Sequence, residues 1–215
     1  MNLSNFLLLP NRGGSRENDL KDRGNMASST DIFDERIQTF LKNCSNDSYL
    51  DIGIGEGKFG KMARIANKKA RIVGVEISQP IIDSCDKGIY DEIKKMNVMD
   101  LIHSYPDFKV GMVMMGDVLE HLKKSDGIDF INYILYRCEY LLIKYPQMYL
   151  QFAEEGPYDG HVSMWFPEEF EKFKCPIKIN ETEEYMNLVV LQGFIGIAKA
   201  NKKRYKTNYE SVRII

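Results

Sequence analysis

A short stretch of the chain, YLDIGIGEGKFG, carries two overlapping glycine patterns that are both typical of nucleotide-binding loops. Gly55, Gly57 and Gly60 fit G-x-G-x-x-G, the dinucleotide-binding fingerprint. Asp51 and Gly53, together with the first two of those glycines, instead fit D-x-G-x-G-x-G, a pattern associated with a different cofactor. Because glycine tolerates positive φ and lets the backbone approach a ligand closely, both patterns predict a cofactor held against this loop.

Acidic residues at strand ends help to choose between the patterns. Glu76 closes the apolar run RIVGVE about 20 residues after the loop, where either cofactor would present ribose hydroxyls. Asp51 lies inside the first expected strand, where a carboxylate without a partner costs several kcal/mol, so a cationic or donor-rich ligand is expected beside it. Asp117 follows the apolar run GMVMMG, at the strand end where open α/β sheets bind ligands. Only about 95 residues follow Leu119, too few for the separate substrate domain of a dehydrogenase, so the second pattern is favoured.

Expected helices and strands alternate along most of the chain, which predicts a parallel sheet covered on both faces. A chain of 215 residues is long enough for one domain with a sizeable core. Strands are expected at 48–55, 71–77, 91–100, 109–119, 140–146, 187–192 and 194–200, and helices at 31–44, 57–70, 79–90, 127–139 and 166–173. Asp31 is the expected N-cap of the first helix. The last two strands flank Gly193 without an intervening helix, so an antiparallel C-terminal hairpin is expected there.

The two ends of the chain differ in composition from the segment between them. Residues 1–30 are interpreted as a flexible tail, because the stretch NRGGSRENDLKDRGNMASST from Asn11 is polar, contains glycine and shows no periodicity. Residues 201–215 are interpreted as a basic C-terminal tail. The folded domain is therefore expected to span residues 31–200.

Bulk composition disfavours several kinds of partner. The 29 basic and 31 acidic side chains give a net charge of −2, which offers no general attraction to nucleic acid or to a membrane surface. The apolar runs are far shorter than a membrane span. Four cysteines without C-x-x-C spacing argue against a disulfide framework or a structural zinc site and favour a reducing compartment. The sequence therefore predicts a cytoplasmic protein.

Four motifs follow one another between residues 31 and 200. The first is DIGIGEG from Asp51, the second GVEIS from Gly74, the third the region YDEIKKMNVMDLI, and the fourth GDVLEHL from Gly116. In this order and spacing they resemble the class I S-adenosylmethionine-dependent methyltransferases. The resemblance implies an α/β fold with a seven-stranded, mostly parallel, doubly wound Rossmann-like sheet whose last strand is inserted antiparallel. Asn97 stands where the family usually has an acid that contacts adenine, and its amide carbonyl can accept the same hydrogen bond.

The resemblance also implies how S-adenosylmethionine would be held. Gly53, Gly55 and Gly57 would let the backbone pass close to its methionine and ribose portions. Asp51 would bind toward the methionine end, and Glu76 would hold the ribose hydroxyls. The other implied contacts are Ile52 within the first motif, Ile77 packed on the adenine, Asn97 and Val98 at the adenine edge, and Asp117 and Val118 beside the methionine moiety. Gly60 is expected to ease helix packing rather than to touch the ligand.

The histidines are candidates for activating an acceptor. Methyl transfer to a hydroxyl is helped by a base that titrates near neutral pH, and histidine suits that role. His161 lies in GPYDGHVSMWF, where related sequences place a lid over the acceptor pocket, so Tyr158, His161 and Trp165 are predicted to bind the acceptor and His161 to be catalytic. Structural alternatives are that His161 pins this loop and that Trp165 belongs to the core. His121 is expected to start or cap a helix, and His103 to lie in a surface connection.

Missing motifs narrow the acceptor. The [DN]-P-P-[YF] motif, which grips planar nitrogens, is replaced by GDVL, and no paired cysteines suit methylation at uracil C5. A metal site formed by Asp117, Glu120 and His121 is disfavoured because these side chains are expected to diverge at a helix start, so no metal is predicted.

The sequence therefore predicts a methyltransferase that uses S-adenosylmethionine and acts on a small-molecule or glycan acceptor, at a hydroxyl rather than a nitrogen. Nucleic acid and membrane are not expected as partners. Methylation of RNA or protein is the alternative activity, and the basic residues from Lys199 onward are its one indication. A non-catalytic S-adenosylmethionine-binding subunit is the alternative from another class. Asn97 favours that alternative, whereas the acid retained at Asp51 opposes it.

Overall fold

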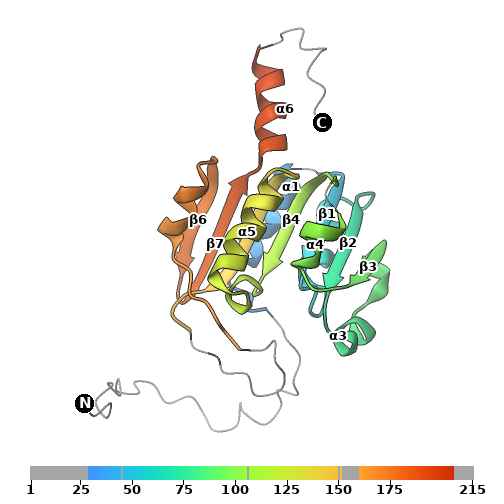
Figure 1. Ribbon diagram of the computed structural model, residues 1–215. Coiled ribbons are helices and arrows are strands. Elements are labelled where there is room, and N and C mark those ends of the chain that lie inside the picture. The colour runs from blue at the N-terminus through green and yellow to red at the C-terminus, as the bar shows by residue number, and fades with distance from the viewer. Residues whose placement is uncertain (1–28, 45, 106, 150, 152–159, 206–215) are drawn as a thin grey trace, which may run out of the picture.

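A seven-stranded sheet in the order β3-β2-β1-β4-β5-β7-β6 forms the centre of the protein (Figure 1). The computed structural model describes residues 29–44, 46–105, 107–149, 151 and 160–205. The strands are β1 (Ser48–Ile52), β2 (Arg71–Glu76), β3 (Glu92–Lys95), β4 (Val110–Gly116), β5 (Cys138–Pro146), β6 (Ile177–Glu183) and β7 (Met186–Gln192). Strands β1 to β5 pair in parallel, and β7 runs antiparallel to both β5 and β6. The predicted mostly parallel α/β fold with an antiparallel hairpin is confirmed.

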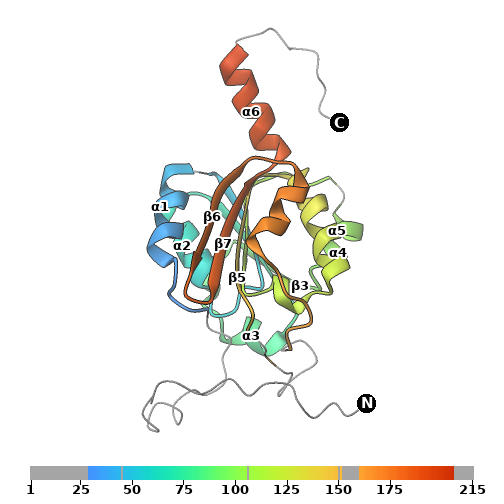
Figure 2. The ribbon, with the colours of Figure 1, turned by 90° about the vertical axis from the view of Figure 1, so that its left-hand side faces the viewer.

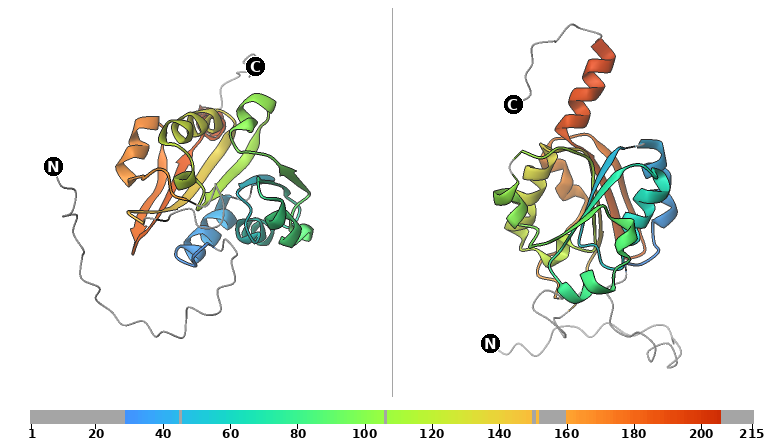
Figure 3. Two further views of the ribbon diagram at one scale, coloured as in Figure 1. Left: turned by 60° about the horizontal axis from the view of Figure 1, so that its bottom comes forward. Right: turned by 90° about the vertical axis from the view of Figure 1, so that its right-hand side faces the viewer.

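Helices cover both faces of the sheet (Figure 2). The helices of the described chain are α1 (Asp34–Cys44), α2 (Lys58–Ala66), α3 (Gln79–Ser84), α4 (Asp100–Ser104), α5 (Lys124–Leu135) and α6 (Phe194–Tyr205), with 3₁₀ turns η1 (Lys87–Ile89), η2 (Leu119–His121) and η3 (Pro167–Phe173). Helix α6 covers neither face and projects beyond the sheet from the end of β7 (Figure 2). Helices α1 and α2 lie on one face, and α4 and α5 lie on the other (Figure 3). Every residue of β4 is buried, as expected of a central strand covered on both sides.

Two apolar clusters fill the space between these layers. On one face, Ile37 and Leu41, spaced four residues apart on α1, are buried in the cluster that contains Met112 of β4. On the other face, Phe130 and Ile134 of α5 are buried with residues from the opposite side of the same strand. This packing fixes the carboxyl ends of the parallel strands β1 to β5 side by side at one end of the sheet.

The antiparallel hairpin is present, but its strands are not the predicted ones. Its turn lies at residues 184–185, between β6 and β7, whereas the predicted strand at 194–200 belongs to helix α6. Strand β6 reads IKINETE and is mostly exposed at the sheet edge, so it lacks the apolar signal of a buried strand. Gly193 ends the sheet instead of turning a hairpin. A Cβ there would lie 2.3 Å from the Cys138 carbonyl oxygen, so the chain passes close to β5 before α6 begins.

The beginning of the described chain also differs from expectation. Helix α1 starts at Asp34 rather than beside an N-cap at Asp31, because Phe33 has φ 71° and interrupts the helical backbone. The Asp31 carboxylate instead pairs with Lys58, at 2.8 Å. Ser29 and Thr30, placed in the tail by composition, accept hydrogen bonds from lysines of the domain.

Some predictions concern residues outside the described part of the chain. These are the tail at residues 1–28, the acceptor-site residue Tyr158, and residues 206–215. Within the described residues, no helix has both the length and the apolar character needed to cross a membrane.

Candidate functional site

The sheet changes winding direction between β1 and β4, at the edge where both strands end. From β1 the chain passes through α2 to β2 on one side, whereas β4 pairs with the other side of β1. Ligands of open α/β sheets bind at such a switch point, outside the carboxyl ends of the strands. The four sequence motifs converge here, since each of them includes the carboxyl end of one strand, β1, β2, β3 or β4, and the loop after it.

The loop after β1 has the backbone shape that its glycines predict. Gly53, Gly55 and Gly57 have φ values of 70°, 47° and 83°. A Cβ on Gly53 would lie 2.4 Å from Cγ2 of Val118, so a side chain there would collide with the loop after β4. Gly57 leads into α2 without a side-chain cap. The glycines therefore let a ligand approach the backbone of this loop closely, while the N–H groups of Gly53 and Gly57 donate to the carbonyl oxygens of Val75 and Ile54.

Asp51 lies in β1 and is fully buried. Its Oδ2 accepts a 2.7 Å hydrogen bond from the hydroxyl of Tyr90, while Oδ1 has no hydrogen-bond partner among the described residues. Burial raises the pKa of Asp51 to about 7, although the bond from Tyr90 opposes that rise. Gly60 makes room for this arrangement, because a Cβ there would meet the Tyr90 ring at 2.6 Å.

The second and third strand ends carry the residues predicted for ribose and adenine. Glu76 is buried at the end of β2, and its Oε1 accepts 2.9 Å hydrogen bonds from the N–H groups of Ile77 and Ser78. Asn97 follows β3, and its Oδ1 accepts from the N–H of Met99 at 2.9 Å. The side-chain carbonyl predicted to meet the adenine amino group therefore already stabilises its own turn and has one lone pair left.

Val98 and Ile77 lie next to these two polar residues. Val98 is 9% exposed and belongs to the apolar cluster beneath α5, whereas Ile77 is half-buried. Ile52, at the end of β1, is buried in the same cluster as Val98. Of these three predicted cofactor contacts, Ile77 therefore presents the most accessible apolar surface.

Asp117 occupies a strained position at the end of β4. Its φ of 53° is unusual for a residue with a side chain, and its Oδ2 is buried without a hydrogen-bond partner in the described structure. Its N–H donates to the Lys144 carbonyl oxygen at 2.9 Å. Lys144 is also fully buried, and burial lowers the pKa of its ammonium while the nearby Asp117 opposes that change. The buried Lys144 ammonium thus lies near the Asp117 carboxylate, whose Oδ2 has no hydrogen-bond partner among the described residues.

A pocket of about 200 Å³ opens at the carboxyl ends of β4 and β5. Its walls come from η2, from the end of β5 and from the segment after residue 160; its lining residues are Glu120, Pro146, Met148, Tyr149, His161, Val162, Ser163 and Met164. Backbone hydrogen bonds from Val162 and Ser163 to the Glu120 carbonyl oxygen tie that segment to η2. A larger, open hollow of about 420 Å³ lies along α1 and contains none of the motif residues.

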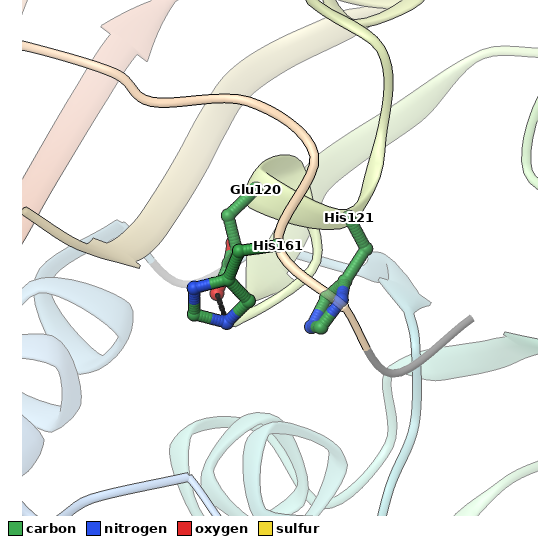
Figure 4. A group of neighbouring side chains, drawn as sticks. All are labelled: Glu120, His121 and His161. Atoms are coloured by element: carbon green, nitrogen blue, oxygen red, sulfur yellow. Dashed lines mark ion pairs between the residues drawn. The ribbon is translucent and has the colours of Figure 1, made fainter. Parts of the chain in front are cut away.

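Glu120, His121 and His161 form a compact polar group, and two of the three residues line this pocket (Figure 4). Their potential ligand atoms all lie within 4.8 Å of one another, and the His161 Nε2 lies 4.0 Å from Glu120 Oε1. The two imidazole rings meet edge to face at 4.9 Å. The expectation that Glu120 and His121 diverge is wrong, because the short η2 turn brings both to one side, facing His161.

Comparison with known proteins matches the motif-bearing part of the chain. The family model described as "Methyltransferase domain" matches residues 50–133, which include the motifs after β1, β2, β3 and β4. This stretch of the chain is a methyltransferase domain, and its motifs and sheet order are similar to those of the class I S-adenosylmethionine-dependent methyltransferases. Its cofactor is S-adenosylmethionine. A search against curated protein sequences finds no match.

Solved structures share the fold of this methyltransferase at low sequence identity. A SAM-dependent methyltransferase from Archaeoglobus fulgidus has a TM-score of 0.58 and 16% identity over 75% of this chain and 93% of its own. A S-adenosylmethionine-dependent methyltransferase from Clostridium acetobutylicum has a TM-score of 0.60 and 11% identity over 77% and 92%. The mitomycin 7-O-methyltransferase MmcR has a TM-score of 0.53 and 14% identity, and the alignment covers 75% of this chain but 54% of MmcR.

The residues of this methyltransferase fit its cofactor. Methionine and ribose need close backbone approach, which the three positive-φ glycines allow, and the ligand's ammonium needs acceptors. Two buried carboxylate oxygens, on Asp51 and Asp117, lack partners among the described residues and lie at this edge of the sheet. When bound, S-adenosylmethionine supplies a methyl group on a positively charged sulfur.

Trp165, predicted to contact the acceptor, does not line the pocket at the ends of β4 and β5. Its side chain is fully buried, its ring centroid lies 5.8 Å from that of Phe170, and its Nε1–H donates to Ser163 Oγ at 2.8 Å. A Cβ on Gly127 of α5 would lie 2.6 Å from the indole, so the ring is closely packed beneath that helix. Apolar burial rather than acceptor binding explains the tryptophan.

Several contributors to the site were missed from the sequence. Tyr90 and Asp51 are 39 residues apart, and no local pattern links them. Tyr149, whose carbonyl oxygen accepts from His161 Nδ1, and Lys144 at the end of β5 carry no motif. Glu120 is part of a sequence motif, but the motif does not predict that its side chain is only 3% exposed. That burial depends on the segment near residue 162, which folds over η2.

Proposed function

We propose that this methyltransferase transfers the methyl group of S-adenosylmethionine to a hydroxyl of a small-molecule or glycan acceptor. The observation that carries the proposal is the position of His161 beside Glu120 in a small pocket at the ends of β4 and β5. A pocket of about 200 Å³ suits a single ring or a short polar chain rather than a folded macromolecule.

The tautomer of His161 supports its assignment as the proton acceptor. Its Nδ1 lies 2.9 Å from the Tyr149 carbonyl oxygen, and since a carbonyl only accepts, Nδ1 carries the proton. The lone pair is therefore on Nε2, on the side of Glu120. In the proposed step, the acceptor oxygen attacks the methyl carbon, the sulfur–carbon bond breaks, and the hydroxyl proton moves to Nε2. Glu120 at 4.0 Å would stabilise the imidazolium that forms.

Two further observations favour oxygen over nitrogen as the nucleophile. The [DN]-P-P-[YF] motif that grips planar nucleobase and glutamine nitrogens is absent, and GDVL stands in its place after β4. MmcR, one of the proteins of similar fold, is by name an O-methyltransferase.

A variant at His161 tests the proposal. His161→Ala is expected to lower turnover of a hydroxyl acceptor by about 10²–10⁴-fold, the usual contribution of a general base, and to leave cofactor affinity unchanged. Formation of S-adenosylhomocysteine would be followed over a panel of phenols, catechols, sugars and amines, with cofactor affinity from calorimetry. His103→Ala, an exposed histidine away from the site, is the matched control.

Two results would contradict the proposal. Methylation confined to amines would show that the acceptor group is not a hydroxyl. A parallel loss of melting temperature and activity in His161→Ala would identify His161 as a residue that holds the loop.

A further inference from the structure

We propose that Glu120, His121 and His161 bind one divalent transition-metal cation, and that this cation contacts the acceptor hydroxyl. The three side chains come from two segments: η2 after β4 and the stretch that follows residue 160 (Figure 4). The role given to the cation rests on the proposed function, whereas its binding does not.

The Glu120 carboxylate gives the first reason. The residue is 3% exposed, and neither of its oxygens has a hydrogen-bond partner among the described residues. A carboxylate buried in this way, without hydrogen-bond donors, is costly in its charged form unless a counter-ion lies beside it. Two carboxylate oxygens that are buried and unpartnered, and that face a pocket, are what a bound cation would satisfy.

The orientation of the two imidazoles gives the second reason. His161 Nδ1 bonds to the Tyr149 carbonyl oxygen at 2.9 Å, and His121 Nδ1 to the Gly160 carbonyl oxygen at 3.2 Å. Each Nδ1 must donate, because a carbonyl oxygen has no proton to give. Both neutral rings therefore have their lone pair on Nε2. Histidine ligands of metals are commonly held in this way, with the second ring nitrogen donating to a backbone carbonyl.

Spacing of the ligand atoms is the third reason. Because the three atoms lie within 4.8 Å of one another, some point lies within about 2.8 Å of all three (4.8 Å divided by √3), compared with about 2.0–2.2 Å for bonds to a metal. Side-chain shifts of under about 1 Å would close that difference. Two imidazoles and one carboxylate suit Zn²⁺, Fe²⁺, Co²⁺ or Mn²⁺ and leave coordination positions open toward the pocket.

An open position beside the acceptor gives the cation a chemical role. A hydroxyl bound to a divalent cation loses its proton far more readily than a free one, and the resulting oxygen is the stronger nucleophile. The proton is released to solvent, and the oxygen then takes the methyl group as the sulfur–carbon bond breaks. In this form of the mechanism the His161 lone pair is used in coordination, so the cation replaces the imidazole as the activating group.

Metal binding can be measured without any acceptor. Full-length protein treated with EDTA would be titrated with Co²⁺, followed by its visible absorption, and with Zn²⁺ and Mn²⁺ by calorimetry. One equivalent is expected to bind. Glu120→Gln and His161→Ala are each expected to weaken binding by at least about 10-fold, and His103→Ala is expected to leave it unchanged. Far-UV circular dichroism checks that each variant folds, and Glu120→Asp, which keeps a carboxylate, is expected to restore part of the affinity.

The result decides the metal site separately from the acceptor. Failure of wild-type protein to bind, equal affinity in Glu120→Gln and His161→Ala, or a cobalt spectrum with thiolate bands would overturn the proposal. Full methyl transfer to a hydroxyl by EDTA-treated protein would remove the cation's role and leave the proposed function standing. Stoichiometric binding that depends on Glu120 and His161 supports the site even where no hydroxyl acceptor is methylated, and in that case the proposed function is what fails.

Discussion

At the scale of single residues, the acid in β1 is stabilised by the protein itself. A carboxylate in a central strand suggests a cationic ligand, but in the structure the Tyr90 hydroxyl donates to Asp51 Oδ2 at 2.7 Å. Gly60 leaves the space that the Tyr90 ring occupies. One oxygen of Asp51 is thus satisfied within the chain, and the other is available to a ligand. Asp51 therefore has one oxygen held by Tyr90 and a second oxygen without a hydrogen-bond partner among the described residues.

The pH dependence of stability should report on Asp51. Its pKa is about 7 in the folded protein, against an ordinary value of 3.8 for an aspartate in water, so folding favours the protonated form. Its contribution to stability is therefore full below about pH 4 and is lost as pH rises through 7, with a slope of up to about 1.4 kcal/mol per pH unit in between. Asp51→Asn should flatten this part of the profile. Urea unfolding of cofactor-free protein at pH 5, 6, 7 and 8 would measure it; parallel profiles for both proteins would show that Asp51 does not titrate in this range.

Residues within one motif were easier to predict than residues that meet through the fold. The glycine loop and the acids at positions 51, 76 and 117 follow from local pattern and from where strands end. The pairing of Tyr90 with Asp51 and of His161 with Glu120 spans about 40 residues each, and depends on the paths of η1 and of the segment after residue 160. The sequence leaves both places open for Trp165, because a lone aromatic beside glycine and proline looks the same whether it faces a pocket or the core, and in the structure it is buried.

At the scale of elements, the short segment before α1 is joined to the sheet edge. The Lys58 ammonium donates to the carbonyl oxygens of Ser29 and Thr30, at 3.1 and 2.7 Å. The buried Lys144 donates to Ser29 Oγ at 2.8 Å and to the Thr30 carbonyl oxygen. Composition placed the domain boundary after residue 30, but these hydrogen bonds make Ser29 and Thr30 part of the folded unit, close to the loop that carries Asp117.

Two truncations should locate this boundary. Removing residues 1–28 is expected to leave the melting temperature nearly unchanged, because most of that stretch, from Asn11 onward, is too polar to bury much surface. Removing residues 1–33 also removes the partners of Lys144 and the buried Phe33, and is expected to cost roughly 2–4 kcal/mol of unfolding free energy. Thermal and urea unfolding of both truncated chains would measure these changes in stability. A large loss on removing residues 1–28 would show that the tail packs on the domain.

Element type was predictable where apolar period and length agreed. Helices α1, α2 and α5 and strands β1, β2, β4 and β5 were expected near their observed positions. Strand β6 has no apolar signal in the sequence, because an edge strand needs little apolar surface. The start of α6 resembles a strand in sequence, because its first residues are apolar and follow another strand directly.

At the scale of the whole molecule, the candidate site and helix α6 lie at opposite ends of the strands of the sheet. The motifs follow the carboxyl ends of the parallel strands, whereas α6 follows the antiparallel β7, whose end pairs with the start of β5 (Figure 1). Lys199 of α6 is also paired with Glu139, which offsets its charge. Lys199 and Lys202, two of the basic residues that indicate RNA as a partner, are therefore remote from the pocket at the ends of β4 and β5.

RNA binding should accordingly be separable from methyl transfer. The double variant Lys199→Gln and Lys202→Gln is expected to leave turnover of a small acceptor unchanged. Any affinity of the wild type for a single-stranded RNA is expected to be weak, to depend on those lysines, and to fall steeply with salt. Fluorescence anisotropy at about 50 and 200 mM salt, beside the activity assay, would test this. Methylation of the RNA that disappears in the variant would instead make RNA the substrate.

The placement of α6 also has a practical consequence. A chain tethered to a sensor surface or to a fluorophore through this helix would present the rim formed by the ends of β1, β4 and β5 to the solution, away from the support. Candidate acceptors, cofactor and cations can then be screened on one immobilised preparation without the attachment point obstructing their entry.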